Sequence, residues 1–256
     1  MRSPMRVLLC ATALATAAAG CTGTPERVRP TAAVTVPASV DPPVVVLDPG
    51  HNGRNAENRA AIERQVPDGR GGMKACNTTG TATDAGYPEH AFTFDVATRV
   101  AQRLAAAGIR AVLTRADDDG VGPCVDERGN AGAAADADAV VSIHADGAAP
   151  EASGFHVALS DPPLHPAQEA PARALGVAVR DAMRAAGFPD ADYIGRDGLD
   201  LRADLAGLNH ATRPTVLVEC ANMRHPEEAA LVSSPEGRDR YAAAIAAGIH
   251  AFLAAR

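Results

Sequence analysis

Two histidines stand where two predicted strands end. His51 comes just after the apolar run Val44–Asp48, and His144 ends the run Ala139–His144. Parallel strands of one sheet share the edge at which their carboxyl ends meet, and ligands of α/β proteins bind beyond that edge. Zinc accepts imidazole nitrogen, and a catalytic zinc site keeps three protein ligands and one open position for water. The two histidines therefore predict a metal site at this edge of the sheet.

The residues alone leave the third ligand open. Glu89 is the best candidate, because it follows Pro88 in the first turn of a predicted helix that enters beside the first strand. His90 is the second candidate and Asp84 is the third. A single histidine or carboxylate in such a position is more often a turn or salt-bridged residue. The metal site is therefore supported by the combination of residues and by no single one of them.

Glu219 ends a third predicted strand, Thr215–Glu219. Burial at a strand end disfavours the charged carboxylate and raises its pKa. A metal hydrolase needs a base that takes a proton from water and then passes it to the leaving amine. We assign this role to Glu219, and the alternative is a helix-capping or salt-bridged carboxylate.

The elements that must position these side chains alternate between strands and helices. This alternation predicts a single-domain α/β fold, with a twisted, mostly parallel β-sheet flanked by helices on both faces. The stretches 52–86 and 189–214 show no clear periodicity, apart from a possible short helix near 201–209. The predicted strands are Val44–Asp48, Ile109–Leu113, Ala139–His144, Gly154–Ser160 and Thr215–Glu219, and the predicted helices run from Pro88 to before Gly108 and over Asp126–Ala135, Ala167–Gly187, Pro226–Leu231 and Glu236–Ala255.

The composition excludes some classes of partner. The chain has 256 residues, of which 46% are hydrophobic but only 3% aromatic, and its formal net charge is −7. Scarce aromatic residues give no platform on which bases could stack, and negative charge opposes binding to a phosphate backbone. We therefore expect no nucleic-acid partner. No segment reads as an interaction helix, so we expect a monomer.

The N-terminus reads as a targeting segment. Arg2 and Arg6 precede the apolar stretch 7–19, which is too short for a confident membrane span. Small residues before Cys21 resemble a bacterial lipoprotein cleavage site. We expect residues 1–20 to be a signal peptide and Cys21 to carry a lipid anchor to the membrane, with ordinary secretory cleavage as the alternative.

Export places the rest of the chain in the extracytoplasmic cell envelope. Residues 21–43 are rich in Pro and Thr and predict a tether, and residues 44–256 predict the folded domain. In an oxidising compartment Cys76 and Cys124 are the natural disulfide pair, with two free thiols as the alternative. We expect the segment Gly69–Gly86, held by this disulfide, to form a flap or hairpin over the groove.

Several short motifs follow one another in a specific order and spacing along the chain. They are Leu47-Asp48-Pro49-Gly50-His51, Glu89 after Gly86-Tyr87-Pro88, Thr114-Arg115, Glu127-Arg128-Gly129-Asn130, Val141-Ser142-Ile143-His144-Ala145-Asp146, Pro214-Thr215-Val216-Leu217-Val218-Glu219 and Asn222-Met223. Taken together, these motifs resemble those of the zinc-dependent N-acetylmuramoyl-L-alanine amidases of the amidase-3 type, and the resemblance covers about residues 44–253.

The resemblance implies that one zinc ion is held by His51, Glu89 and His144, and that Glu219 is the catalytic glutamate. The implied reaction is hydrolysis of the peptidoglycan amide bond between the lactyl group of N-acetylmuramic acid and L-alanine of the stem peptide, by zinc-activated water. Arg202 is a further candidate, which could face a carboxylate of the stem peptide or simply point to solvent. Two other functions stay open: a different zinc peptidase acting on stem peptides, and a non-enzymatic wall-binding lipoprotein.

Overall fold

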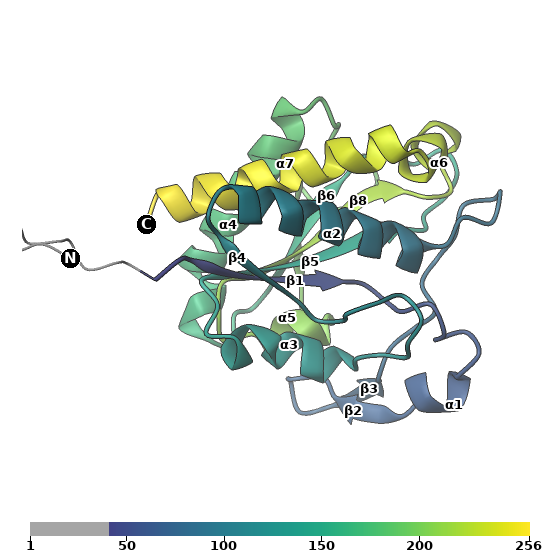
Figure 1. The fold of residues 1–256 in the computed structure, drawn as a ribbon. Helices are drawn as coiled ribbons and strands as arrows, with labels where there is room; N and C mark the ends of the chain where they lie inside the picture. Colours follow the sequence, from purple (N-terminus) through teal and green to yellow (C-terminus); the bar gives the residue numbers. More distant parts are fainter. Residues whose placement is uncertain (1–40) are drawn as a thin grey trace, which may run out of the picture. The chain divides into compact units, whose positions relative to one another are not determined.

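The computed structural model describes residues 41–256, which form a central six-stranded sheet with helices on both faces (Figure 1). The strand order across the sheet is β4-β1-β5-β8-β6-β7. The strands are β1 (Val44–Pro49), β4 (Arg110–Leu113), β5 (Ala139–Asp146), β6 (His156–Ser160), β7 (Leu199–Arg202) and β8 (Thr215–Asn222). The helices are α1 (Arg59–Ile62), α2 (Glu89–Ala106), α3 (Val125–Ala134), α4 (Ala170–Ala185), α5 (Ala206–Asn209), α6 (Pro226–Ser233) and α7 (Pro235–Ala254), with a 3₁₀ turn at Pro166–Gln168.

The sheet is mixed but mostly parallel, which confirms the predicted fold class. Strands β4, β1, β5 and β8 run parallel to one another. Strand β6 runs antiparallel to β8, and β7 pairs in parallel with β6. Strand β7 lies in a stretch expected to be loop, because Asp200 and Arg202 interrupt any apolar run that would predict a strand.

The main core lies between the sheet and helices α2, α4 and α7, all on one face (Figure 1). Alternate strand residues, such as Leu47 and Val218, point to this face and pack with Phe92 of α2 and Tyr241 of α7. Helices α3 and α5 cover the opposite face, where the buried cluster around Val46 is much smaller. The second face therefore leaves room for a cavity.

A disulfide-linked excursion separates β1 from α2. The hairpin of β2 (Gln65–Pro67) and β3 (Met73–Ala75) begins before the predicted flap or hairpin Gly69–Gly86 and overlaps only its first part. Cys76, which follows β3, forms a disulfide with Cys124 at the start of α3, as predicted. The disulfide fixes the hairpin against the helix that covers the second face.

Two buried arginines hold the end of β1. Arg128 of α3 pairs with Asp48 at 2.6 Å and donates to the carbonyls of Pro49 and His51. Arg115 donates to the carbonyls of Pro49 and Gly50. Burial alone would raise the pKa of Asp48, but Arg128, with hydroxyl donors from neighbouring strands, lowers it to about 2.

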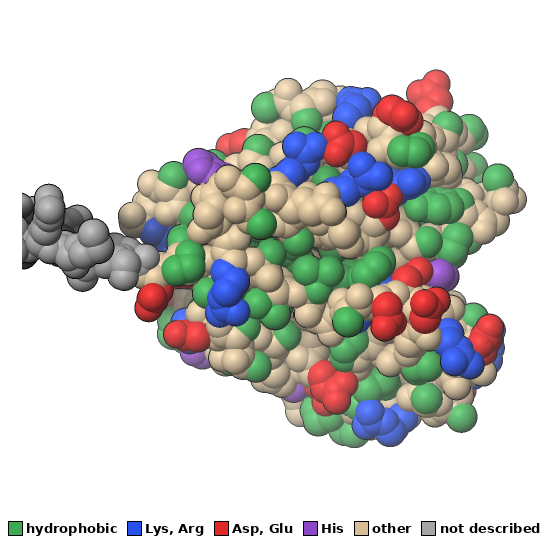
Figure 2. All heavy atoms as spheres, viewed as in Figure 1, with side chains coloured by type: hydrophobic (Ala, Val, Ile, Leu, Met, Phe, Trp, Pro, Cys, Tyr) green, Lys and Arg blue, Asp and Glu red, His purple; other side chains and the backbone are tan. Residues whose placement is uncertain are grey.

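Lys, Arg, Asp and Glu side chains are interspersed over the face of the molecule in Figure 2. This mixture on that face does not form the continuous basic surface that a nucleic-acid backbone requires. Within residues 41–256, no helix combines the length and apolarity needed to cross a membrane. The predicted signal peptide, the lipidation site Cys21 and most of the tether lie outside the described residues.

We expect Arg128→Met to lower the free energy of unfolding by about 3–5 kcal/mol, because it leaves the buried Asp48 carboxylate without its partner. The loss should be smaller at pH 3 than at pH 7. The lowered pKa of Asp48 means that its stabilising charge is fully present above about pH 4 and is lost as the pH falls toward about 2. Denaturant unfolding at both pH values measures the effect. The control Arg54→Met removes an exposed ion pair with Glu57 and should cost less than about 1 kcal/mol; equal losses in the two variants would contradict the role of Arg128.

Reduction of the Cys76–Cys124 disulfide should lower the free energy of unfolding by about 2–4 kcal/mol, since the crosslink closes a long loop in the unfolded chain. Unfolding curves with and without reductant, together with a thiol count, test this. The double variant Cys76→Ser and Cys124→Ser should be less stable and insensitive to reductant. Unchanged stability in a fully reduced sample would show that the crosslink contributes nothing.

Candidate metal centre

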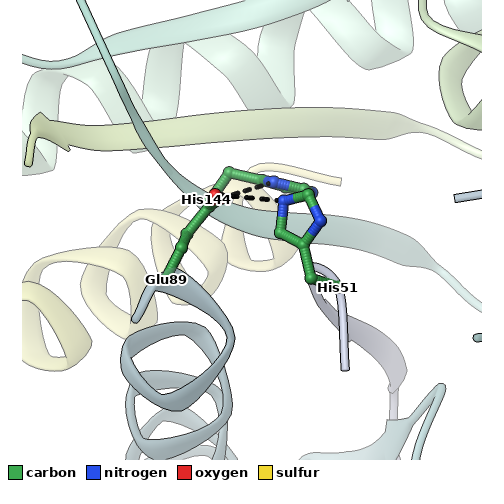
Figure 3. Close-up of side chains that lie close together, drawn as sticks. All are labelled: His51, Glu89 and His144. Atoms are coloured by element: carbon green, nitrogen blue, oxygen red, sulfur yellow. Dashed lines mark hydrogen bonds and ion pairs between the residues drawn. The ribbon is translucent and has the colours of Figure 1, made fainter. Parts of the chain in front are cut away.

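Three side chains converge at the carboxyl edge of the sheet (Figure 3). His51 Nε2 lies 3.1 Å from Glu89 Oε2, and His144 Nδ1 lies 3.0 Å from Glu89 Oε1. One nitrogen or oxygen atom from each residue lies within 4.8 Å of the others. Two imidazole nitrogens and one carboxylate oxygen, so grouped, could hold a metal ion.

Close backbone packing brings the two imidazoles together. His51 adopts a left-handed conformation with φ of 59°, which turns its side chain toward β5. A Cβ atom on Gly50 would lie 2.3 Å from the His144 ring, so only glycine fits there. The Nδ1 atom of His51 lies 3.2 Å from the carbonyl oxygen of Thr78. If Nδ1 carries the proton, it donates to that carbonyl and leaves the Nε2 lone pair directed at Glu89.

Glu89 is the carboxylate that joins the two histidines. It is the first residue of α2, and its two oxygens accept hydrogen bonds from the backbone N–H groups of Thr81 and Ala145. Burial alone would raise the pKa of Glu89, but the adjacent His51 and His144 lower it below its ordinary value. The carboxylate is therefore held in the charged form that metal binding requires.

The other two candidates for the third ligand lie elsewhere. His90 turns away and its Nδ1 lies 2.6 Å from Asp118. Asp84 is exposed and pairs with Arg224 at 2.7 Å. Neither residue belongs to the cluster. Of the three candidates for the third ligand, Glu89 is the one that lies next to His51 and His144.

Glu219 lies beside the cluster without joining it. It is the residue of β8 that pairs with His144 of β5 in the sheet. Its Oε2 atom is buried and accepts no hydrogen bond within residues 41–256. Burial raises the pKa of Glu219 well above its ordinary value, and the negative charge of Glu89 raises it further. A carboxyl group with these properties is suited to accept and return a proton.

All four residues line one cavity of about 520 Å³ between the sheet and helices α3 and α5. This volume suits a small ligand or part of a larger one. The segment that follows β3 forms one wall, so part of the predicted flap Gly69–Gly86 does line the cavity. Other lining residues are Asp48, Lys74, Ala75, Asn77, Thr78, Gly80, Thr81, Val125, Arg128, Val140, Ser142, Ala145, Asp146, Gly147, Leu205, Ala206, Gly207, Leu208, Thr215 and Leu217.

His156, which the sequence reasoning missed, lies next to Glu219 in the sheet without lining the cavity. It pairs directly with Glu219 across the antiparallel strands β6 and β8, so both side chains point to the same face of the sheet. It is 1% exposed, and its Nδ1 atom has no hydrogen-bond partner within the described residues. The alternation of residues in the predicted strand Gly154–Ser160 could have placed His156 on this face, but nothing in the sequence alone indicated the pairing with Glu219.

Arg202 is placed differently from the other predicted site residues. Its guanidinium pairs with Asp204 at 2.7 Å and with Asp200 at 3.2 Å. Arg202 does not line the cavity. Contact with a substrate carboxylate stays a prediction for this residue, whose guanidinium is paired with the two aspartates.

Comparison with known proteins identifies relatives over nearly the whole described chain. The family model described as N-acetylmuramoyl-L-alanine amidase matches residues 45–251. The chain is 49% identical over 218 residues to the N-acetylmuramoyl-L-alanine amidase Rv3717 of Mycobacterium tuberculosis, which covers 85% of this chain and 89% of that relative.

Solved structures agree with this result. The amidase Ami1 of Mycobacterium smegmatis is 52% identical with a TM-score of 0.81, covering 84% of this chain and 98% of that one. The amidase AmiC2 of Nostoc punctiforme is 26% identical with a TM-score of 0.62, covering 83% and 97%. These comparisons confirm the enzyme class that the order of the motifs predicts. The chain belongs to the N-acetylmuramoyl-L-alanine amidase family.

Proposed function

We propose that this protein is a zinc-dependent peptidoglycan hydrolase that cleaves the amide bond between the lactyl group of N-acetylmuramic acid and L-alanine of the stem peptide. One observation carries the proposal: a cluster of two histidines and a glutamate shares a cavity with a second glutamate of raised pKa. Family membership supports the choice of this amide bond among those that a metal hydrolase could cleave.

His51, Glu89 and His144 would hold the zinc ion. The donor set fits, since zinc commonly takes imidazole nitrogen together with carboxylate oxygen. A bound zinc ion would supply the Lewis acid that activates water and polarises the scissile carbonyl. The hydrogen bonds to Glu89 from two backbone N–H groups keep its oxygens directed at the histidines.

Glu219 would move the proton. Its free Oε2 atom can accept a proton from the attacking water and return it to the alanine nitrogen as the amide bond breaks. Its raised pKa brings it nearer to working pH, where one group can serve as base and then as acid. The cavity walls of α5 and the hairpin would exclude bulk water from this exchange.

Peptidoglycan as substrate places the protein in the extracytoplasmic envelope. A lipid anchor at Cys21 and the tether that follows would keep the domain near the membrane, with secretion as the alternative. We propose a monomer as the working form. Size-exclusion chromatography and membrane fractionation of the full chain test these points.

Substitution should separate the two glutamates by role. We expect Glu89→Ala to lose both zinc and turnover, and Glu219→Gln to keep zinc while kcat falls by about 10²–10⁴-fold, as for loss of a general acid–base. Metal analysis of the purified protein and initial rates on muropeptides measure both effects. The control His90→Ala removes the rival candidate ligand and should retain zinc. Full turnover in Glu219→Gln would overturn the proposed mechanism.

The products identify the bond that is cleaved. Mass spectrometry of purified muropeptides after digestion should show a muramic acid with a free lactyl carboxylate and a stem peptide with a free L-alanine amine. Cleavage within the stem peptide would favour the zinc peptidase alternative. Undigested substrate in the presence of stoichiometric zinc would favour the non-enzymatic wall-binding alternative.

A further inference from the structure

Lys74 is the single lysine of the chain, and it lines the cavity of the candidate metal centre. It lies in β3, on the hairpin held by the Cys76–Cys124 disulfide. The other 23 basic side chains are arginines. A compact ammonium on a flexible stem therefore occurs at only one place, and that place faces the site.

The ammonium of Lys74 uses one of its N–H donors within the described residues. Its Nζ atom donates to the carbonyl oxygen of Asp204 at 2.7 Å and forms no ion pair with any carboxylate of residues 41–256. An ammonium carries three N–H donors. Two of them therefore have no partner among the described residues and are available to a ligand.

The other permanent cation on the cavity wall is fully used. Arg128 donates five hydrogen bonds within the protein. The acceptors are the carboxylate of Asp48 and the carbonyls of Pro49, His51, Gly122 and Pro123. The wall also carries the carboxylate of Asp146, which would repel an anionic ligand. Lys74 is the group on this wall that can attract one.

We propose that Lys74 forms a subsite for the carboxylate of the stem-peptide residue that follows L-alanine. The inference rests on the proposed function, because that residue enters the cavity only if the scissile amide lies at the metal centre. A stem peptide presents there a glutamyl residue, linked onward through its γ-carboxyl, whose α-carboxyl is either free or amidated. Lys74 would favour the free carboxylate by a charge-assisted hydrogen bond.

Two matched substrates test the subsite. Both are N-acetylmuramoyl-L-alanyl-D-glutamyl compounds with the γ-carboxyl capped as a methylamide, and they differ only in a free or amidated α-carboxyl. Loss of one charged hydrogen bond is expected to cost about tenfold in kcat/KM, so the wild type should prefer the acid by about that factor. Lys74→Met should abolish the preference, mainly by raising KM for the acid, and Lys74→Arg should restore part of it.

The control Arg59→Met removes an exposed positive charge outside the cavity and should keep the wild-type preference. Equal rates of the wild type on both substrates, or an unchanged preference in Lys74→Met, would overturn the inference while leaving the amidase assignment intact. An equal loss on both substrates in Lys74→Met would show that Lys74 only holds the hairpin to Asp204, which also overturns it. Hydrolysis of neither substrate by the wild type would contradict the proposed function itself, and the subsite with it.

Discussion

The position of His51 depends on two buried guanidinium groups that hold the turn after β1. Arg115 and Arg128 donate to three successive carbonyls, those of Pro49, Gly50 and His51. Buried carbonyls need such partners once they leave the sheet ladder. The arginines therefore let the chain turn sharply at the sheet edge and place the His51 imidazole against Glu89 and His144. The grouping of the three candidate ligands depends on this turn.

The pKa values of two glutamates on neighbouring elements are shifted in opposite directions because their surroundings differ. Glu89 lies between two imidazoles and two backbone N–H groups, which favour its charge and lower its pKa. Glu219 lies a short distance away, where burial and the charge of Glu89 raise its pKa. The charge of Glu89 thus raises the pKa of its neighbour Glu219, which suits Glu219 to carry a proton. This division between ligand and base is the basis of the proposed mechanism.

Much of the fold follows from hydrophobic periodicity. The runs around Leu47, Val141 and Val216 predict buried strands, and Phe92, Val96, Val100 and Leu104 repeat every four residues along α2. Strand β7 was missed because two of its four residues, Asp200 and Arg202, are charged. A flap or hairpin was expected over Gly69–Gly86, but the strands that pair are Gln65–Pro67 and Met73–Ala75, which are too short to show a hydrophobic pattern.

The candidate site residues that end predicted strands could be predicted from the sequence. His144 and Glu219 pair in the sheet, and the strand pattern alone indicates that they share an edge. The residues alone ranked Glu89 before His90 but left both open, because spacing does not give the directions of adjacent side chains at a helix start. In the structure the backbone N–H of Thr81 donates to Glu89, whose carboxylate lies between the histidines. The position of His156 next to Glu219 was not predicted, because it depends on the antiparallel register of β6 against β8.

The central claim is that His51, Glu89 and His144 bind one metal ion next to Glu219. Anomalous diffraction from crystals of the zinc-loaded protein, recorded on both sides of the zinc absorption edge, tests it directly. The account predicts one peak at about 2.0–2.2 Å from a nitrogen of each histidine and an oxygen of Glu89, in the cavity that Glu219 lines. A fully loaded crystal whose zinc peak lies away from these three residues, or within bonding distance of Glu219 in place of Glu89, would contradict it.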